Sequence, residues 1–553
     1  MRPLFVKYRT DSGQEHLYDL GTGWIIDIDS TIGEIVQDYG ILTKEEIVQK
    51  YDRLGRENVL TALRELGELQ EKKFLPDHSP EEIAKINQIQ FDNKRYEIED
   101  FWQSHASLLI LCLTERCNLC CSYCCYSGNF VGQRRHSNRS MSREIAEKAI
   151  LDYLGNEPVE ESYYSITFYG GEPLLEFDLL RDMVLFADDL AKKKGKEIRY
   201  SITTNGTLLD DEKIDFFVEH QFMVQVSFDG PKRMHDRYRV FRNGTGSFDI
   251  VEKNLRRFVE RYPDYRYRGF LATLVPPLEL EETRVFLEEF YSHYMLSRIS
   301  LVNTGVEARF MDNPVSSTRY GCYSASACEP QFPTDAFRQF SEKEGAELGQ
   351  MRSKWIESVK KYGLWETKKL MPLATMLFEQ AVSSIHGRPV TTRKPKWPIL
   401  APCFPGFTRR FCDVEGNYRV CERVDESETF KLGNVQTGLN HEKLERLMEL
   451  RRAFGDCANC TAQKTCDICY ARIPNSDDDA SGFDPMFDLQ CQRTRQALPA
   501  QLKMYTEIME VNPNAFNIPG SNAKSSRLES LRYCVLSKQM SDETDERIQY
   551  ESF

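Results

Sequence analysis

Residues 117–124 read Cys-Asn-Leu-Cys-Cys-Ser-Tyr-Cys and are the most informative stretch of this 553-residue chain. They follow an apolar run at 108–111, which predicts a buried strand that leads into a loop. Cys117, Cys121 and Cys124 have the spacing C-x3-C-x2-C. Three thiolates on one loop can hold three irons of a 4Fe–4S cluster and leave the fourth iron open to a substrate or cofactor, whereas a fourth cysteine closes the cluster.

The motif has two other interpretations. Cysteine-rich loops also form structural zinc sites and disulfide frameworks. The neighbouring Cys120 and Cys125 leave the ligand count ambiguous. The loop by itself does not distinguish an iron–sulfur cluster from a zinc site or a disulfide framework, so other motifs of the chain are needed.

The composition bounds the class of protein. A chain of 553 residues has room for about two to four domains with sizeable cores. Its 17 cysteines cluster at metal-ligand spacings, and its first residues do not resemble a signal peptide. No apolar run approaches the ~20 residues that cross a bilayer, so we expect a cytoplasmic protein with reduced thiols and no membrane partner. The net charge of −13, with both signs interspersed, argues against a nucleic-acid partner.

The first 75 residues predict a small α+β module. Its strand patterns lie at 5–8, 16–20 and 24–28. Helix patterns follow, one with a capping box at Thr43 and one over 57–74 with apolar residues at helical spacing. Ser79 then predicts the N-cap of a linking helix within 76–104.

From about 105 to 305, strand patterns alternate with amphipathic helix patterns. The predicted strands are 107–113, 165–169, 199–204, 223–228, 268–275 and 299–303. The predicted helices are 142–154, 176–194, 211–219, 248–261 and 281–294. Six β-α units predict a parallel sheet with helices outside and functional residues at the C-terminal strand ends. Residues 306–400 predict a helical insert, and 496–553 predict a helical tail.

Polar motifs follow successive predicted strands of this region. They are Gly170-Gly171-Glu172-Pro173, Thr204-Asn205-Gly206, Ser227-Phe228-Asp229-Gly230 and His235-Asp236-Arg237-Tyr238-Arg239. Each motif alone predicts only a turn. Glycines also allow close approach of the backbone to a ligand, and a carboxylate suits an ammonium group. All four motifs fall at the edge of the sheet where the cysteine loop begins.

Together with the cysteine loop, these motifs resemble the radical S-adenosylmethionine (SAM) enzymes. The resemblance implies an α/β fold with a partial (β/α)6 TIM-type barrel, and a 4Fe–4S cluster on Cys117, Cys121 and Cys124 whose open iron chelates SAM. In that family the GGEP motif holds the amino group of SAM, the aromatic residue of the cysteine motif meets the adenine, and later motifs contact the ribose and carboxylate. The implied SAM contacts are Tyr123, Gly170, Gly171, Glu172, Asn205, Ser227 and Arg239.

A second group of cysteines lies within 401–495, where a C-x12-G-x4-C pattern is followed by two CxxC pairs. This group resembles the SPASM domain, a cysteine-rich iron–sulfur domain with two auxiliary 4Fe–4S clusters. The chain departs from that pattern by an x2 spacing before the sixth cysteine, where x3 is usual, and by the extra candidate Cys412. The implied ligand sets are Cys403, Cys412, Cys421 and Cys469 for the first cluster, and Cys457, Cys460, Cys466 and Cys491 for the second. The competing interpretation is zinc on the CxxC pairs, although their separation is shorter than the ~15–20 residues of common zinc ribbons.

The N-terminal module resembles the winged-helix-like recognition element of many peptide-modifying enzymes, which binds a leader peptide as an added strand. An ordinary small capping domain is the alternative. The chain as a whole resembles a radical SAM/SPASM maturase of ribosomally made peptides. This resemblance implies an oxidoreductase with three 4Fe–4S clusters, SAM, a precursor peptide bound by its leader, and an external electron donor of the flavodoxin or ferredoxin type. The expected product is a cysteine thioether crosslink.

Other products and another class of protein remain open at this point. Carbon–carbon or carbon–oxygen crosslinks are alternatives within the class, as is the formylglycine maturation of sulfatases. Sulfatase maturases place an aspartate directly after the cysteine that matches Cys421, where this chain has Glu422. A non-enzymatic iron–sulfur or zinc regulator is the alternative from another class, but it has no need of the GGEP motif.

Overall fold

The computed structural model describes residues 4–72, 74–75, 108–124, 126–127, 134–155, 163–275, 278–294, 296–301, 342–388, 406, 409–424, 426–444, 446–447, 460–466 and 485–517. The linking helix predicted at Ser79 lies outside these ranges. The predicted cluster ligands Cys403, Cys457 and Cys469 also lie outside them.

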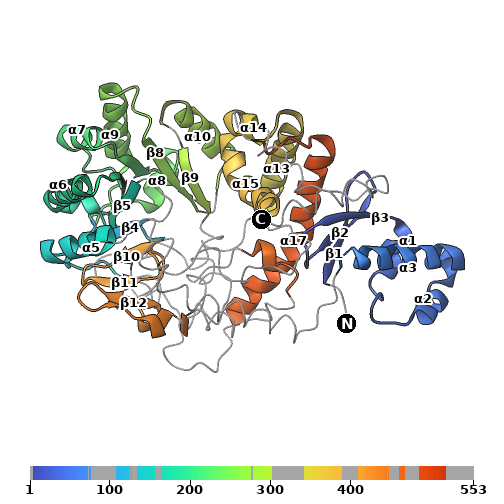
Figure 1. The fold of residues 1–553 in the computed structure, drawn as a ribbon. Helices are drawn as coiled ribbons and strands as arrows, with labels where there is room; N and C mark the ends of the chain where they lie inside the picture. The colour runs from blue at the N-terminus through green and yellow to red at the C-terminus, as the bar shows by residue number, and fades with distance from the viewer. Residues whose placement is uncertain are drawn as a thin grey trace.

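Six parallel strands form the centre of the molecule in their chain order, β4-β5-β6-β7-β8-β9 (Figure 1). The strands are β4 (Leu109–Thr114), β5 (Tyr163–Gly170), β6 (Glu197–Thr204), β7 (Met223–Ser227), β8 (Arg268–Leu274) and β9 (Leu296–Leu301). The helices of this region are α5 (Arg143–Gly155), α6 (Phe177–Lys194), α7 (Asp211–Glu219), α8 (Lys232–Tyr238), α9 (Phe248–Arg261) and α10 (Leu280–Tyr294). The predicted α/β class with its parallel sheet is confirmed, and every predicted strand of the barrel is present.

The barrel strands are held by an apolar core, because alternate residues of each strand face inward. In β5, Ile166 and Phe168 are fully buried. The ring of Phe168 stacks on Tyr200 of β6 and on Phe222, with centroid distances of 6.3 and 5.9 Å. This aromatic layer helps to fix the register of β5 and β6. The polar residues at the ends of these strands therefore lie at defined positions relative to one another.

The C-terminal strands continue the same sheet. Strand β10 (Arg410–Cys412) pairs in parallel with β4, and β11 (Asn417–Arg419), β12 (Lys431–Asn434) and β13 (Gly438–Leu439) follow it antiparallel. Arg410, which is fully buried, and the hydroxyl of Tyr418 both donate to the Asp152 carboxylate of α5, at 3.2 and 2.7 Å. The region of the second cysteine group is therefore anchored beside the strand that leads into the first.

The N-terminal module has its own three-stranded antiparallel sheet and its own apolar core. Its elements are β1 (Phe5–Arg9), β2 (Glu15–Asp19), β3 (Ile25–Ile28), α1 (Ser30–Ile35), α2 (Lys44–Lys50) and α3 (Arg56–Glu71). The capping box predicted at Thr43 is present, with Glu46 as its second member. The module thus has the strand and helix order that its sequence predicts.

Four further helices lie between the barrel and this module (Figure 1). They are α13 (Glu342–Tyr362), α14 (Leu364–Leu370), α15 (Pro372–His386) and α17 (Pro485–Val511). The hydroxyl of Tyr8 in β1 lies 2.7 Å from that of Thr506, so α17 docks onto the N-terminal sheet. Helix α17 begins before residue 496 and contains Cys491, so the predicted start of the C-terminal tail falls inside a helix. In the part of the chain that the structure describes, no helix is long and apolar enough to cross a membrane.

We predict that Phe168→Ala lowers the free energy of unfolding by roughly 3–5 kcal/mol, because it leaves a cavity in the aromatic layer. Chemical denaturation followed by circular dichroism measures the loss. Leu151→Ala is the matched control, because the Leu151 side chain is 49% exposed and its loss leaves no cavity. Equal effects of the two substitutions would contradict the assignment of this layer to the core.

Candidate functional site

The loop after β5 is fastened by its backbone to the start of the cysteine loop. The N–H groups of Gly171 and Glu172 donate to the carbonyls of Thr114 and Arg116, both at 2.8 Å. A Cβ atom on Gly170 would lie 2.3 Å from the Thr114 carbonyl oxygen, and one on Gly171 would lie 2.2 Å from that of Arg116. Gly170 also has a φ of +140°. Only glycine permits this contact, so the two motifs meet at main-chain distance.

Glu172 is fully buried and joins this loop to the end of β6. Its carboxylate accepts hydrogen bonds from the Asn205 N–H at 2.7 Å, the Thr204 hydroxyl at 2.7 Å and the Leu174 N–H at 3.0 Å. Burial raises the pKa of Glu172, and these three donors oppose the shift. An ionised carboxylate offers about four acceptor positions, so one remains for a further donor.

Asn205 connects β6 to the cysteine loop itself. Its side-chain N–H donates to the side-chain oxygen Oδ1 of Asn118 at 2.8 Å and lies 3.9 Å from the Cys117 sulfur. Its own side-chain oxygen Oδ1 accepts from the Thr207 N–H at 3.0 Å. Asn205 therefore holds the loop at its first cysteine. Ser227, the last residue of β7, is paired with Leu271 of β8 and lies at the same edge of the sheet.

Tyr123, Asp229 and Arg239 form a buried polar group beside the cysteines. The Tyr123 hydroxyl donates to the Asp229 carboxylate and accepts from Arg239 at 2.6 Å, and Arg239 lies 3.8 Å from Asp229. Burial raises the pKa of both Tyr123 and Asp229. Burial alone would lower the pKa of Arg239, but the charges of Tyr123, Cys121 and Asp229 raise it well above the usual value. The guanidinium therefore stays charged.

The backbone around Arg239 fastens the middle of the cysteine loop. The Cys120 N–H donates to the Val240 carbonyl at 2.7 Å, and Leu119 forms an antiparallel bridge with Phe241. Cys120 itself forms a disulfide and is not a free thiolate, so it is not available as a cluster ligand in this form. The loop is thus held at its start by the ends of β5 and β6, and in its middle by the segment that follows α8.

The three candidate ligands share one small apolar cluster with Leu119, Tyr123 and Val275. The Cys117 sulfur accepts from the Leu119 N–H and the Cys124 sulfur from the Tyr126 N–H, both at 3.4 Å. Burial raises the pKa of Cys117 to about 12, with a further contribution from Cys121. Binding of metal must therefore displace thiol protons. Hydrogen bonds to sulfur are among the features that set the reduction potential of iron–sulfur clusters.

These features fit a cluster with an anionic ligand beside it. Three thiols on one loop match the donor set of an open 4Fe–4S cluster. The buried Nε of Arg239 has no hydrogen-bond acceptor among the residues that the structure describes. A buried donor of this kind is costly unless a ligand satisfies it, and a carboxylate is the natural partner of a guanidinium. Within the described ranges, no three His, Cys, Asp or Glu side chains are grouped as a metal-ion site.

The C-terminal cysteines differ in their surroundings. Cys421 follows β11, is partly buried and accepts from the Arg423 N–H at 3.4 Å. Cys412 is fully buried within β10, and its thiol donates to the Asp413 carbonyl at 3.7 Å. Burial raises its pKa well above the usual value, and nearby charges that include Cys112 add to the shift. This placement favours a packing role for Cys412. Cys460, Cys466 and Cys491 are partly buried against the main core.

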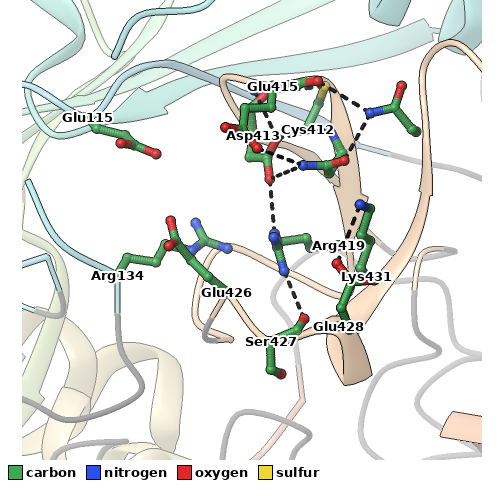
Figure 2. Close-up of polar contacts among 12 residues, drawn as sticks. Glu115, Arg134, Cys412, Asp413, Glu415, Arg419, Glu426, Ser427, Glu428 and Lys431 are labelled. Atoms are coloured by element: carbon green, nitrogen blue, oxygen red, sulfur yellow. Dashed lines mark hydrogen bonds and ion pairs between the residues drawn. The ribbon is translucent and has the colours of Figure 1, made fainter. Parts of the chain in front are cut away.

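The hairpin between β10 and β11 is held by its own polar contacts (Figure 2). Asp413 accepts from the N–H groups of Glu415 and Asn417, at 3.0 and 2.9 Å, and from Arg419 at 3.0 Å. Arg419 also donates to the Ser427 carbonyl at 3.0 Å. The hairpin that leads to Cys421 is therefore a rigid element.

Sequence reasoning missed several residues that support the site. Asn118, Asp229, Tyr126 and Arg134 carry no signature by themselves, although Asp229 lies inside a motif that was recognised. The signal that could have found Asp229 is an aspartate at the end of a buried strand. Arg134 lies far from the C-terminal region in sequence, so only the fold brings the two together.

Residues 111–290 match the family model of the Radical SAM superfamily. The serine-type anaerobic sulfatase-maturating enzyme of Bacteroides thetaiotaomicron is 38% identical over 143 residues, which is 25% of this chain and 33% of that protein. The cysteine-type enzyme of Clostridium novyi is 33% identical over 157 residues, or 28% of this chain and 41% of that protein. The chain thus spans between a third and about two-fifths of the length of these curated relatives.

Among solved structures, native anSMEcpe with bound AdoMet and the Cp18Cys peptide is similar with a TM-score of 0.48 and 19% identity. That similarity covers 72% of this chain and 99% of the other.

We predict that Cys421→Ala loses about four irons per chain after anaerobic reconstitution, whereas Cys412→Ala keeps its full iron content. The reason is that Cys412 is enclosed by the sheet, while Cys421 lies beyond its strand. Iron and labile-sulfide analysis measures both variants, with Cys112→Ala as a control for a buried thiol of the neighbouring strand. Loss of iron from Cys412→Ala but not from Cys112→Ala would restore Cys412 to the ligand set.

Proposed function

We propose that this protein is a radical SAM enzyme that modifies a ribosomally made precursor peptide. The observation that carries the proposal is the cysteine loop of a radical SAM domain, fastened at Cys117 by Asn205 and at Cys120 by Val240. When bound, a reduced 4Fe–4S cluster and SAM supply the 5′-deoxyadenosyl radical that abstracts hydrogen from a substrate carbon. The residues of the chain bind, orient and shield these groups.

Each residue of the site then has a role in binding. Cys117, Cys121 and Cys124 hold the cluster, and Gly170 and Gly171 let the backbone of their loop approach the ligand. The remaining acceptor position of Glu172 takes the ammonium group of SAM. The free Nε–H of Arg239 takes its carboxylate. Tyr123 contacts the adenine of SAM, and Asn205 and Ser227 contact its ribose.

We further propose two auxiliary 4Fe–4S clusters in the C-terminal region. The ligands are Cys403, Cys421 and Cys469 for one, and Cys457, Cys460, Cys466 and Cys491 for the other. The pairing of β10 with β4 supports this proposal, because it brings the second cysteine group next to the barrel. An external electron donor of the flavodoxin or ferredoxin type supplies electrons.

The substrate class follows from two separate arguments. The curated relatives carry the name of sulfatase-maturating enzymes, which indicates chemistry on polypeptide side chains. The N-terminal module offers a sheet edge for a leader peptide. Within the described residues β1 and β3 each pair only with β2, so both are edges of the module's sheet. A leader strand is therefore expected to add to one of these two edges. We propose a cysteine thioether as the product.

Formylglycine formation is the second candidate function, and the names of the relatives favour it. The residue after Cys421 is Glu422, whose carboxylate is ion-paired with Arg409 at 2.7 Å. Its second oxygen is buried and has no hydrogen-bond partner among the described residues. A hydrazide probe separates the two products, because it labels an aldehyde and does not label a thioether.

We predict that the reduced, reconstituted protein cleaves SAM to 5′-deoxyadenosine. The triple replacement of Cys117, Cys121 and Cys124 by alanine abolishes the cleavage and keeps the auxiliary iron. Glu172→Ala weakens SAM binding by a few kcal/mol, because the ammonium loses its partner and the Thr204 and Asn205 donors lose their acceptor. Chromatography of the products and equilibrium dialysis of SAM measure these effects. Unchanged SAM affinity in Glu172→Ala would remove this residue from the site.

We predict that removal of residues 1–75 abolishes processing of the full-length precursor but leaves peptide-independent SAM cleavage within about twofold. Every proposed SAM contact lies in the barrel, outside the module. Thr506→Val is the matched control, because it removes the contact to Tyr8 without deleting the sheet edge. Mass spectrometry of the precursor reports processing. Normal processing by the truncated enzyme would reduce the module to a structural cap.

A further inference from the structure

Arg134 bridges the two cysteine regions of the molecule. It is buried, with 3% of its surface exposed. Its Nη1 donates to the Tyr126 hydroxyl at 2.8 Å, and its Nη2 donates to the Cys421 carbonyl at 3.4 Å. The guanidinium also lies over the ring of Phe411 in β10, 4.2 Å from the centroid. One side chain thus contacts the barrel side and the C-terminal side at once.

Both ends of this bridge lie next to a candidate ligand sulfur. Tyr126, which Arg134 contacts through the hydroxyl, donates its N–H to the Cys124 sulfur at 3.4 Å. Cys421, which Arg134 contacts through the carbonyl, accepts at its sulfur from the Arg423 N–H at 3.4 Å. A short chain of hydrogen bonds and covalent bonds therefore runs from one thiol to the other through Arg134.

The segment that carries Arg134 is itself held in place. Ser127 and Arg135 form an antiparallel bridge, and the His136 N–H donates to the Tyr126 carbonyl at 2.8 Å. The His136 ring stacks on Tyr126 with a centroid distance of 5.7 Å. Arg139 pairs with Glu115 at 2.8 Å and with Glu415 of the C-terminal hairpin at 2.6 Å. In Figure 2 Arg134 and Glu115 lie on the barrel side and Arg419 and Ser427 on the hairpin side.

We propose that Arg134 is a positioning residue for electron exchange between the Cys124 and Cys421 clusters. It fixes the distance between the two cysteine loops, and its buried positive charge favours the reduced form of both clusters. The inference rests on the proposed function, since it requires a cluster at each site. An arginine suits this role, because its planar fork makes both hydrogen bonds while its face stacks on Phe411, and a lysine cannot do all three.

The positive charge of Arg134 and its bridging hydrogen bonds affect two different properties of the clusters. A reduced cluster is more negative than an oxidised one, so a nearby buried cation raises its reduction potential. Loss of the charge therefore shifts the potentials to more negative values. Loss of the bridge alone changes the spacing between the loops, and hence the magnetic coupling between the two reduced clusters.

The test uses the full-length, reconstituted protein and its Arg134→Gln, Arg134→Lys and Tyr126→Phe variants. A redox titration monitored by electron paramagnetic resonance measures the reduction potentials of the clusters and the magnetic coupling between them. Neither measurement depends on turnover. We expect more negative potentials in Arg134→Gln and a smaller shift in Arg134→Lys, which keeps the charge. Tyr126→Phe removes one hydrogen bond only, so we expect altered coupling with nearly unchanged potentials.

Arg135→Gln is the matched control, because it removes one charge from an exposed neighbouring position. Variants with full iron content whose potentials and coupling equal those of the parent protein overturn the inference. Iron loss in both Arg134 variants but not in Arg135→Gln supports it, because the bridge then holds the loops in ligating positions. Failure of the parent protein to bind iron or cleave SAM would instead overturn the proposed function.

Discussion

The buried carboxylate of Glu172 is the contact on which the site depends. It collects three donors, two of them from Thr204 and Asn205 at the end of β6. Its own N–H donates to the Arg116 carbonyl, one residue before the first cysteine of the loop. The ends of β4, β5 and β6 are thereby joined through one side chain and its backbone. Burying a carboxylate is expensive unless it is hydrogen-bonded, so loss of these contacts is unfavourable and the three strand ends have little freedom to separate.

Beside the Glu172 contacts, the site contains a buried polar network of Tyr123, Asp229 and Arg239. Burial of these groups would be unfavourable without hydrogen bonds between them. Asp229 and Arg239 are both buried, and Tyr123 bridges them. Such a network is stabilising only when each member is satisfied, and the Nε of Arg239 still lacks an acceptor among the described residues. It places a tyrosine of the cysteine loop against residues from the end of β7 and of α8. The loop is thus held by charged groups on one side and by the Glu172 contacts on the other.

The extension of the barrel sheet by β10 to β13 determines where the C-terminal cysteines lie relative to the first cysteine loop. Because β10 pairs with β4, the strand that leads into the first cysteine group has the second group as its neighbour. The N-terminal module attaches elsewhere. It contacts α17 through Tyr8, and Lys464 of the segment between Cys460 and Cys466 donates to its Gly21 carbonyl at 3.1 Å. The module therefore lies against the segment that carries Cys460 and Cys466.

The sequence by itself determined the class of the barrel, most of its strands and helices, and the motifs at their ends. Alternating and helical periodicities are local properties, and so is the spacing of Cys117, Cys121 and Cys124. The sequence could not determine which partners these residues take. The hydrogen bonds of Glu172, the group of Tyr123 with Asp229, the burial of Cys412 in β10 and the bridge through Arg134 all join segments that are distant along the chain. Such contacts depend on the order in which strands pair, and that order is a property of the tertiary structure alone.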